Sequence, residues 1–438
     1  MFAPQSRNAF SEVVTTLEPN EQLRLLSRDA EHMTLELQSG EAEIFGARLV
    51  LNKVYSFSSD YSLSLFTYSG CKIRFQIAKP GQLDNDRPTV RPEFKQGQKN
   101  LMMMLHLKIH TVLEQLRERC DVKEERGPIV MIVGPKDVGK STLATTLTNY
   151  AVRMSKKRTP VFVDTDPGQG SLSLPGTIGS ALITEEIQPE KNISEQVDPL
   201  IYNVGSTRLG GNPIYKLMIS KLAASVLNRL ESNKRAKSSG LIINTPGWTQ
   251  SEGFDLIKHT AQAFEVDIIL VLYQKKLYDE LYRVMPNFVK LVQMPKLEGV
   301  RFRSQELRWE CRDRVLKDYF YGPNNELKPY VFDVEWKDFK VYKVFYTDDS
   351  RPESISLSFP ALNTSLRNRI LAVTFAQKKD DALESNISGF VCVADVVCQV
   401  RDKKVTLLSP FPPPLPDVCY LMTSLFLTPN SIPNNGQS

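Results

Sequence analysis

The chain has 438 residues, of which 41% are hydrophobic and 24% charged, and these values are ordinary for a soluble globular protein. Its net charge of +5 indicates an anionic partner only weakly. The six cysteines are scattered without a CxxC pair, and only four histidines occur, which argues against a zinc site or a disulfide framework. No apolar run approaches the roughly 20 residues that span a bilayer, and no secretory signal opens the chain, so we expect an intracellular protein with no membrane partner.

The first hundred residues predict an all-β domain. Short segments of mixed apolar and polar residues alternate with Gly, Ser and Asp from about residue 20 to residue 90: LRLLS, MTLELQSG, AEIFGARLV, VYSFSS and LSLFTYSG. A polar stretch with several prolines follows at 79–100 and is typical of a linker. We therefore place a β-sandwich-like domain and its linker at 1–105. In the helical pattern that comes next, His106 and His110 have a spacing that could hold a metal, but ordinary packing is expected because no carboxylate or cysteine joins them.

From Gly127 to about Gly322 the pattern changes to strands that alternate with helices. The strands are short, β-branched and almost unbroken in their apolar character: PIVMIVG, TPVFVDTD, GLIINTPG and VDIILVLY. Such strands are typical of a parallel sheet with helices on both faces, so the fold class is α/β, with a central phosphate-loop NTPase domain at 106–324. After Pro329 strands return, and we expect a smaller, β-rich α/β domain at 325–438.

The segment GPKDVGKS fits the phosphate-loop pattern G-x-x-x-x-G-K-[ST]. It follows a predicted strand and opens a predicted helix, which is the context that the motif requires. Backbone amides of such a loop surround phosphates, Lys140 would pair with the β and γ oxygens, and Ser141 would ligate Mg²⁺. The predicted nucleotide-binding residues are Gly134, Pro135, Lys136, Asp137, Val138, Gly139, Lys140, Ser141 and Thr142.

Two carboxylates follow the next strand, in VFVDTDPGQG. Asp164 and Asp166 lie at its carboxyl end, which is where ligands sit in open α/β sheets. Two acids in this position can divide two tasks, so that one holds the metal and its water shell while the other takes a proton from a nucleophile. The position alone leaves open which of the two acids has which task.

The rest of the sequence favours a phosphoryl transferase over a switch or a motor. A GTPase switch needs an N-K-x-D or T-K-x-D motif to read guanine, but QKKLYDE follows VDIILVLY. A motor usually has a second nucleotide motif or an oligomeric arginine finger, and no repeat is seen. A transferase needs a cationic lid, which the segment RFRSQELRWECRDRVLKDYFYG could supply.

The lid candidates are three arginines in that segment. Arg308 and Arg312 share a helix face, and Arg303 lies toward the helix start. An adjacent apolar stripe would seat the helix on the protein. It consists of Leu307, Cys311 and Val315. The alternative is a solvated, charged helix.

Together, GPKDVGKST, DTDPGQG, GSTRLGGNPIYK, NTPGWTQ, FEVDIILVL and ECRDRVLKDYFYG resemble the polynucleotide 5′-hydroxyl kinases. These kinases are found as a subunit of the pre-mRNA 3′-end cleavage machinery (cleavage factor II) and, in animals, with the tRNA-splicing endonuclease complex. The resemblance covers most of the chain. It implies ATP and Mg²⁺ as cofactors, an RNA with a 5′-hydroxyl end as acceptor, a partner subunit of cleavage factor II, and a nuclear location.

The resemblance also implies roles for individual residues. Asp166 would be the base, which leaves Asp164 for the metal, and the three lid arginines would stabilise the moving phosphoryl group. Trp248 would clasp the terminal nucleotide of the RNA together with Ser206 and Thr207, and Gln169 falls within a family motif. Trp309 stands where a further arginine can occur. Some members of the family bind ATP tightly without kinase activity and serve as scaffolds, so an ATP-bound scaffold is the main alternative to an active enzyme.

Overall fold

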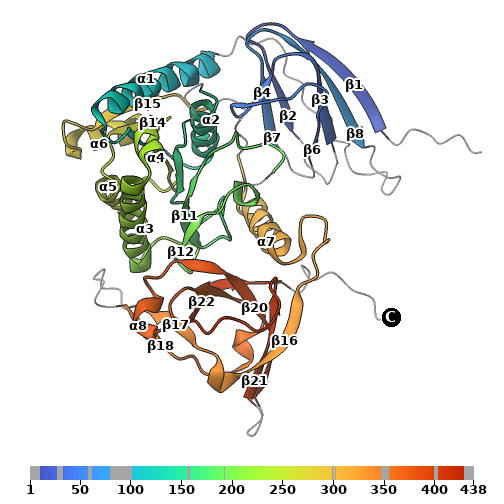
Figure 1. Cartoon of the computed structure of the whole chain (residues 1–438), viewed down its shortest axis with the longest axis vertical. Helices are drawn as coiled ribbons and strands as arrows, with labels where there is room; N and C mark the ends of the chain where they lie inside the picture. The colour runs from blue at the N-terminus through green and yellow to red at the C-terminus, as the bar shows by residue number, and fades with distance from the viewer. Residues whose placement is uncertain are drawn as a thin grey trace, which may run out of the picture.

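The computed structural model describes residues 10–26, 33–57, 62–78, 101–154, 158–191, 193–297, 300, 302–346, 355–398 and 403–428. An N-terminal β part (blue) and a C-terminal β-rich part (orange to red) flank a central α/β part in Figure 1. The predicted α/β class with flanking domains is therefore confirmed, while the limits 1–105, 106–324 and 325–438 stay predictions. The expected linker at 79–100 lies outside the described residues.

The N-terminal part is a sandwich of two four-stranded sheets, with strand orders β1-β8-β3-β6 and β2-β7-β4-β5. Alternation along β3 explains the packing, because Met33, Leu35 and Leu37 are buried while their neighbours are half-exposed. The strands are β1 (Phe10–Leu17), β2 (Gln22–Leu26), β3 (Met33–Gly40), β4 (Glu43–Ile44), β5 (Ala47–Arg48), β6 (Val54–Phe57), β7 (Ser62–Phe66) and β8 (Cys71–Ala78).

Five parallel strands, in the order β15-β14-β9-β13-β10, form the frame of the central part. Strands β9, β10, β13 and β14 are the four that the sequence predicts. The bounds are β9 (Ile129–Val133), β10 (Val161–Asp164), β13 (Leu241–Asn244), β14 (Ile268–Leu272) and β15 (Lys290–Met294). Strand β15 escapes prediction because it is the edge of the sheet, where most of its residues are exposed and the apolar signal is weak.

Helices cover both faces of this sheet, which explains why β9 is apolar at every position. Val130 and Ile132 pack with residues of α2 and α7, while Met131 packs on the other face with residues of α3 and α5. The helices of this part are α1 (Leu101–Lys123), α2 (Lys140–Val152), α3 (Pro213–Ser232), α4 (Lys234–Ser239), α5 (Glu252–Ala263), α6 (Lys275–Val284) and α7 (Gln305–Tyr321).

The sheet as a whole is mixed rather than parallel. Strands β11 (Thr177–Leu182) and β12 (Leu200–Asn203) continue it with antiparallel pairing after β10. A single pairing of Ile201 with Ile387 then joins β12 to β20, so one 14-stranded sheet runs into the C-terminal part. That part contains β16 (Tyr330–Glu335), β17 (Val341–Phe345), β18 (Ser356–Ser358), β19 (Arg369–Thr374), α8 (Lys379–Ala382), β20 (Ile387–Cys398), β21 (Lys403–Ser409) and β22 (Tyr420–Phe426).

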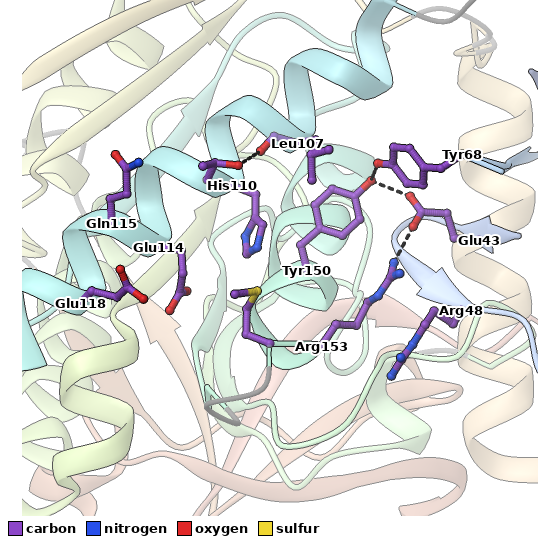
Figure 2. A pocket seen from close by; sticks show the side chains of 12 residues that line it. Glu43, Arg48, Tyr68, Leu107, His110, Glu114, Gln115, Glu118, Tyr150 and Arg153 are labelled. Carbon is purple, nitrogen blue, oxygen red and sulfur yellow. Dashed lines mark hydrogen bonds and ion pairs between the residues drawn. The ribbon is translucent and has the colours of Figure 1, made fainter. Parts of the chain in front are cut away.

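The N-terminal sandwich docks on the far end of α2, the helix that the phosphate loop opens. The carboxylate of Glu43 accepts a hydrogen bond of 2.5 Å from the Tyr150 hydroxyl and pairs with Arg153, and the hydroxyls of Tyr68 and Tyr150 lie 2.9 Å apart (Figure 2). Burial raises the pKa of Glu43, although both partners favour its charged form. This network fixes the end of α2 against the β4–β5 turn.

A pocket lies beside this network, between α1, the end of α2 and the N-terminal sandwich (Figure 2). His110 lines it and His106 is buried one helical turn earlier. Burial lowers the pKa of each imidazole to about 4, so both are neutral near pH 7. Within the described ranges, no three His, Cys, Asp or Glu side chains gather as a metal site, and no helix there is long and apolar enough to cross a membrane.

We predict that Tyr150→Phe destabilises the protein by about 1–3 kcal/mol, because it removes a hydrogen bond to the buried Glu43 carboxylate. Thermal unfolding followed by circular dichroism should show a lower Tm. Tyr282→Phe is the control, because Tyr282 is a tyrosine on α6 that is 70% exposed. An unchanged Tm in Tyr150→Phe would contradict the docking role of the network.

Candidate active site

The predicted phosphate loop connects β9 to α2 at the carboxyl edge of the parallel strands. Gly134 and Gly139 have φ values of 150° and 97°, which favour glycine, and a Cβ on Gly139 would lie 2.7 Å from the Cβ of Leu297. Asp137, between them, is also left-handed, with φ at 56°. The loop therefore turns tightly and leads into the positive end of the α2 dipole, which favours phosphate binding.

Lys140 extends from the first position of α2 back along the loop. Its side chain is buried, with 8% exposed, and its ammonium donates a 2.8 Å hydrogen bond to the Pro135 carbonyl. Burial lowers the pKa of Lys140 to about 8, against the opposing charges of Asp166 and Asp137. The ammonium is thus held among acidic groups at the place where a nucleotide phosphate would bind.

Oxygen atoms of three elements meet next to the start of α2. The Ser141 hydroxyl is 3.4 Å from the Asn244 side-chain oxygen, and the Asn244 amide donates a 3.0 Å hydrogen bond to Asp164. Ser171 also donates to Asp164. Burial raises the pKa of Asp164 to about 6, and the neighbouring charge of Asp166 adds to this effect. Hydroxyl and carboxylate oxygens next to a phosphate loop are the ligands that Mg²⁺ prefers, so these residues fit that ion.

Asp166 lies two residues beyond β10, as the sequence predicts. Its carboxylate accepts a 2.9 Å hydrogen bond from the Gly168 backbone, and its own backbone N–H donates to Asp164. These contacts fix the turn that carries the two acids. Burial lowers the pKa values of Lys140 and Arg312, and the negative charge of Asp166 opposes this effect at both, so Asp166 lies near cations of both the phosphate loop and the lid.

Helix α7 brings the lid arginines to the phosphate loop through Asp137. The Arg308 guanidinium donates a 2.5 Å hydrogen bond to the Asp137 carboxylate, and the Arg303 backbone N–H donates to the same oxygen at 3.3 Å. Arg303 also donates a 3.1 Å hydrogen bond to the side chain of Gln169. Burial and the charge of Arg308 lower the pKa of Arg312. The structure therefore brings the three arginines, Asp137 and Gln169 together.

The side chains that bury α7 against the protein are not those of the predicted apolar stripe. Leu307, Cys311 and Val315 are only half-buried. The fully buried side chains of the helix are Leu316, Phe320 and Tyr321. The helix is thus anchored toward its C-terminal end, and its arginine-bearing first half lies over the loop. Ser304 caps that half by accepting a hydrogen bond from Leu307.

The predicted RNA-binding residues lie on two loops beside the site. Trp248 is half-buried, packs on the core beneath α5, and also lines an open pocket with Pro135 of the phosphate loop. Ser206 and Thr207 are half-buried in the loop after β12, where Ser206 accepts a hydrogen bond from the backbone of Arg208. Trp248 contacts this loop at Gly210, because a Cβ there would lie 3.5 Å from the indole. The RNA roles of these residues stay predictions.

Sequence reasoning missed two functional features of the site. Asn244 ends β13 beside β10 and links Ser141 to Asp164, and its polar side chain at the carboxyl end of a buried strand is the signal that could have revealed it. Asp137 was assigned to nucleotide binding, but its side chain contacts the lid. No sequence pattern indicates a pairing across more than 160 residues.

Three family models match the chain in order: the N-terminal beta-sandwich domain of polyadenylation factor over residues 16–120, the mRNA cleavage and polyadenylation factor CLP1 P-loop over 134–322, and the pre-mRNA cleavage complex II protein Clp1 over 327–427. The Protein CLP1 homolog of Anopheles gambiae is 39% identical over 425 residues, which cover 93% of this chain and 96% of the relative. The chain belongs to the Clp1 family.

Other Clp1 relatives give the same result. The polyribonucleotide 5′-hydroxyl-kinase Clp1 of Homo sapiens is 39% identical over 412 residues, which cover 91% of this chain and 93% of the relative. The Clp1 protein of a solved Clp1p–Pcf11p complex shares the fold, with a TM-score of 0.78 at 23% identity over 96% of this chain and 98% of that one. The resemblance to this kinase family that the sequence motifs indicate is therefore confirmed.

We predict that Asp137→Asn lowers kcat for phosphoryl transfer by roughly 10- to 100-fold, because the lid arginines lose the charge that positions them. The affinity for ATP should rise, since one negative charge next to the phosphates is removed. Asparagine tolerates the left-handed backbone at this position. Steady-state kinetics and calorimetric ATP titration measure the two effects.

Asp395→Asn is the matched control, because Asp395 also pairs with an arginine, Arg367, but in the C-terminal part. It should leave both quantities unchanged. Weaker ATP binding with normal kcat in Asp137→Asn would show that Asp137 only shapes the phosphate loop.

Proposed function

We propose that this chain is an ATP-dependent polyribonucleotide 5′-hydroxyl kinase, which transfers the γ-phosphoryl group of ATP to the 5′-hydroxyl of RNA. The observation that carries the proposal is the convergence of Lys140, Asp166 and the lid arginines on one phosphate loop. A phosphoryl transferase needs a cation at the phosphates, a proton acceptor and a lid that neutralises charge. The names of relatives at 39% identity over most of the chain support the RNA acceptor.

The cofactors that we propose are ATP and Mg²⁺. The name of a second solved Clp1p–Pcf11p structure refers to ATP loss in a point mutant, which supports ATP as the nucleotide. Ser141 and Asp164 would hold Mg²⁺, with Asn244 keeping their oxygens in place. When bound, this ion would supply positive charge that offsets the negative charge of the phosphates during transfer.

The backbone and side chains of the site would divide the work of binding, proton transfer and charge stabilisation. The loop amides and Lys140 bind the β- and γ-phosphates, so that the γ-phosphorus faces the acceptor. Asp166 accepts the proton of the 5′-hydroxyl as its oxygen bonds to the γ-phosphorus, and ADP leaves with the electron pair of the broken bond. Arg303, Arg308 and Arg312 would close over the transferring group and exclude water.

We also propose that the chain works with protein partners in the nucleus. The match to a pre-mRNA cleavage complex II protein and the Clp1p–Pcf11p complexes support a Pcf11-like subunit of cleavage factor II as partner. The association with the tRNA-splicing endonuclease complex, and the action in tRNA splicing and mRNA 3′-end processing, rest on the kinase family alone.

The second candidate is an ATP-bound scaffold without turnover. The observation that favours it is the pairing of Arg303 and Arg308 with Asp137, which occupies two lid cations inside the protein. Incubation with γ-labelled ATP and a 5′-hydroxyl RNA oligonucleotide separates the candidates. Label at the RNA 5′ end supports the kinase, retained ATP without transfer supports the scaffold, and GTP hydrolysis without transfer would support the third alternative, a switch.

We predict that Asp166→Asn lowers kcat for this transfer by roughly 10²- to 10⁴-fold, which is the usual contribution of general-base catalysis. ATP should still bind, because Asp166 acts on the acceptor. Lys140→Ala should lower transfer by orders of magnitude, because it removes a cation that stabilises the transferring phosphoryl group, while the fold survives. Rapid quench measurements of label transfer and ATP titrations test both variants. Near-normal transfer by folded Asp166→Asn would overturn the assignment of the base.

A further inference from the structure

Tyr273 is an exposed aromatic residue on the ligand side of the parallel sheet. It directly follows β14, the strand next to β9, at the carboxyl edge where the phosphate loop also lies. Its side chain is 63% exposed. An aromatic ring in this position gains little from burial, so packing does not explain it.

The backbone at Tyr273 is strained. Its φ is 66°, in the left-handed region that glycine, asparagine and aspartate tolerate and that is unfavourable for a bulky residue. The Gln274 N–H donates to the Leu272 carbonyl at 2.8 Å, which closes a γ-turn around Tyr273, and γ-turns with a positive φ are rare and strained. The Tyr273 N–H donates a 2.7 Å hydrogen bond to the carbonyl of Met294, the last residue of β15, and this bond holds the turn against that strand. Such strain persists where the surrounding structure enforces it, and it is concentrated at functional sites.

The Tyr273 side chain lines a pocket that opens beside the phosphate loop. The pocket has a volume of about 680 Å³, within the usual range for small-molecule sites. A hydrogen bond of 2.8 Å from Thr249 to Gln274 joins its two flanking loops. The lining residues are Pro135, Gly247, Trp248, Thr249, Gln250, Tyr273 and Gln274. Two aromatic residues, from the loops after β13 and β14, thus line one pocket.

The pocket borders the end of the phosphate loop that is expected to hold the γ-phosphate. In such loops the lysine pairs with the β- and γ-phosphates, and here the Lys140 ammonium lies 2.8 Å from the carbonyl of Pro135. Pro135 is also a wall of the pocket. The β13 loop touches the phosphate loop here, because a Cβ on Gly247 would lie 2.8 Å from the backbone of Lys136. The acceptor of the phosphoryl group must reach the γ-phosphate end of the loop, whereas the nucleoside of ATP is expected beyond the opposite end of the triphosphate.

We propose that Tyr273 stacks on the base of the 5′-terminal nucleotide of the RNA acceptor, in the pocket that it shares with Trp248. This inference rests on the proposed function and adds a substrate-binding residue to it. Stacking accepts any base, because every base has a π-face, and it suits an enzyme that must phosphorylate ends of different sequence. The strained turn directs the ring into solvent at the mouth of the pocket, where a base can reach it.

The test is Tyr273→Asn, since asparagine tolerates the left-handed backbone and lacks an aromatic ring. Stacking contributes roughly 1–3 kcal/mol per base, so kcat/KM for 5′-hydroxyl RNA should fall by about 5- to 150-fold, with similar losses for all four terminal bases. The Tm should stay equal or rise, because the strain is relieved. Tyr273→Phe should retain near-normal kinetics. A merely structural tyrosine would give the opposite pattern, with a lower Tm and normal use of RNA.

Two controls are needed. One distinguishes the loss of the aromatic ring from the relief of backbone strain, and the other distinguishes contacts with the terminal base from contacts with the rest of the RNA. Glu265→Asn changes another exposed left-handed residue, with φ at 54°, outside the pocket, and should leave RNA kinetics unchanged. An RNA that lacks its 5′-terminal base should be used equally well by wild type and Tyr273→Asn. A variant that still discriminates between the two RNAs as wild type does would overturn the proposal.

Direct binding distinguishes failure of this inference from failure of the proposed function. Fluorescence anisotropy of a labelled 5′-hydroxyl RNA should show about 5- to 150-fold weaker binding to Tyr273→Asn, even if wild type transfers no phosphate. Unchanged RNA affinity would overturn the stacking role whatever the kinase assay shows. An equal loss of ATP affinity, measured by calorimetry, would instead assign the pocket to the base of ATP and also overturn the proposal.

Discussion

The pairing of Asp137 with Arg303 and Arg308 is the interaction on which the geometry of the site depends. The Asp137 carboxylate has only 4% of its side chain exposed, and a buried charge of this kind needs cations close by. In the described part of the chain these cations are Arg308, near the start of α7, and Arg303, just before that helix. The same guanidinium groups are the ones expected to stabilise a transferring phosphoryl group, so Asp137 holds them beside the place where that group is expected to lie.

Helix α2 is held at both ends and thereby connects the phosphate loop to the N-terminal sandwich. Its 13 residues span about 20 Å. At its start lie Lys140 and the lid contacts, and at its end Tyr150 and Arg153 bind the buried Glu43 of the N-terminal sandwich. The sandwich therefore supports the phosphate loop from behind, although none of its residues lies in the predicted site. Displacement of the sandwich would shift α2, and the Lys140 side chain at the start of this helix would shift with it relative to the phosphate loop.

The sequence predicts those parts of the fold and the site that depend on local patterns. Strands β9, β10, β13 and β14 have unbroken apolar runs because they are buried on both faces. Asp164 ends β10, Asp166 lies two residues beyond it, and Lys140 follows β9 in the phosphate-loop motif. Strands β11 and β12 were not predicted, because their antiparallel pairing depends on partners far along the chain. The contacts of Asp137 with Arg308 and of Asn244 with Ser141 join residues more than 100 positions apart, so no spacing rule could find them.

Trp248 shows why local reasoning about exposure has a limit. A tryptophan in a Pro-Gly turn beyond a strand is expected to be exposed, yet a Cβ on Gly253 would lie 2.7 Å from its ring, so glycine there lets α5 pack against the indole. One side of Trp248 therefore belongs to the core, while the other lines the pocket beside Pro135. A ring anchored in this way cannot turn away from a ligand, so little side-chain entropy is lost when a base stacks on it. Tyr273 differs, because the γ-turn fixes only its main chain and its exposed ring keeps its rotamer freedom until a ligand binds.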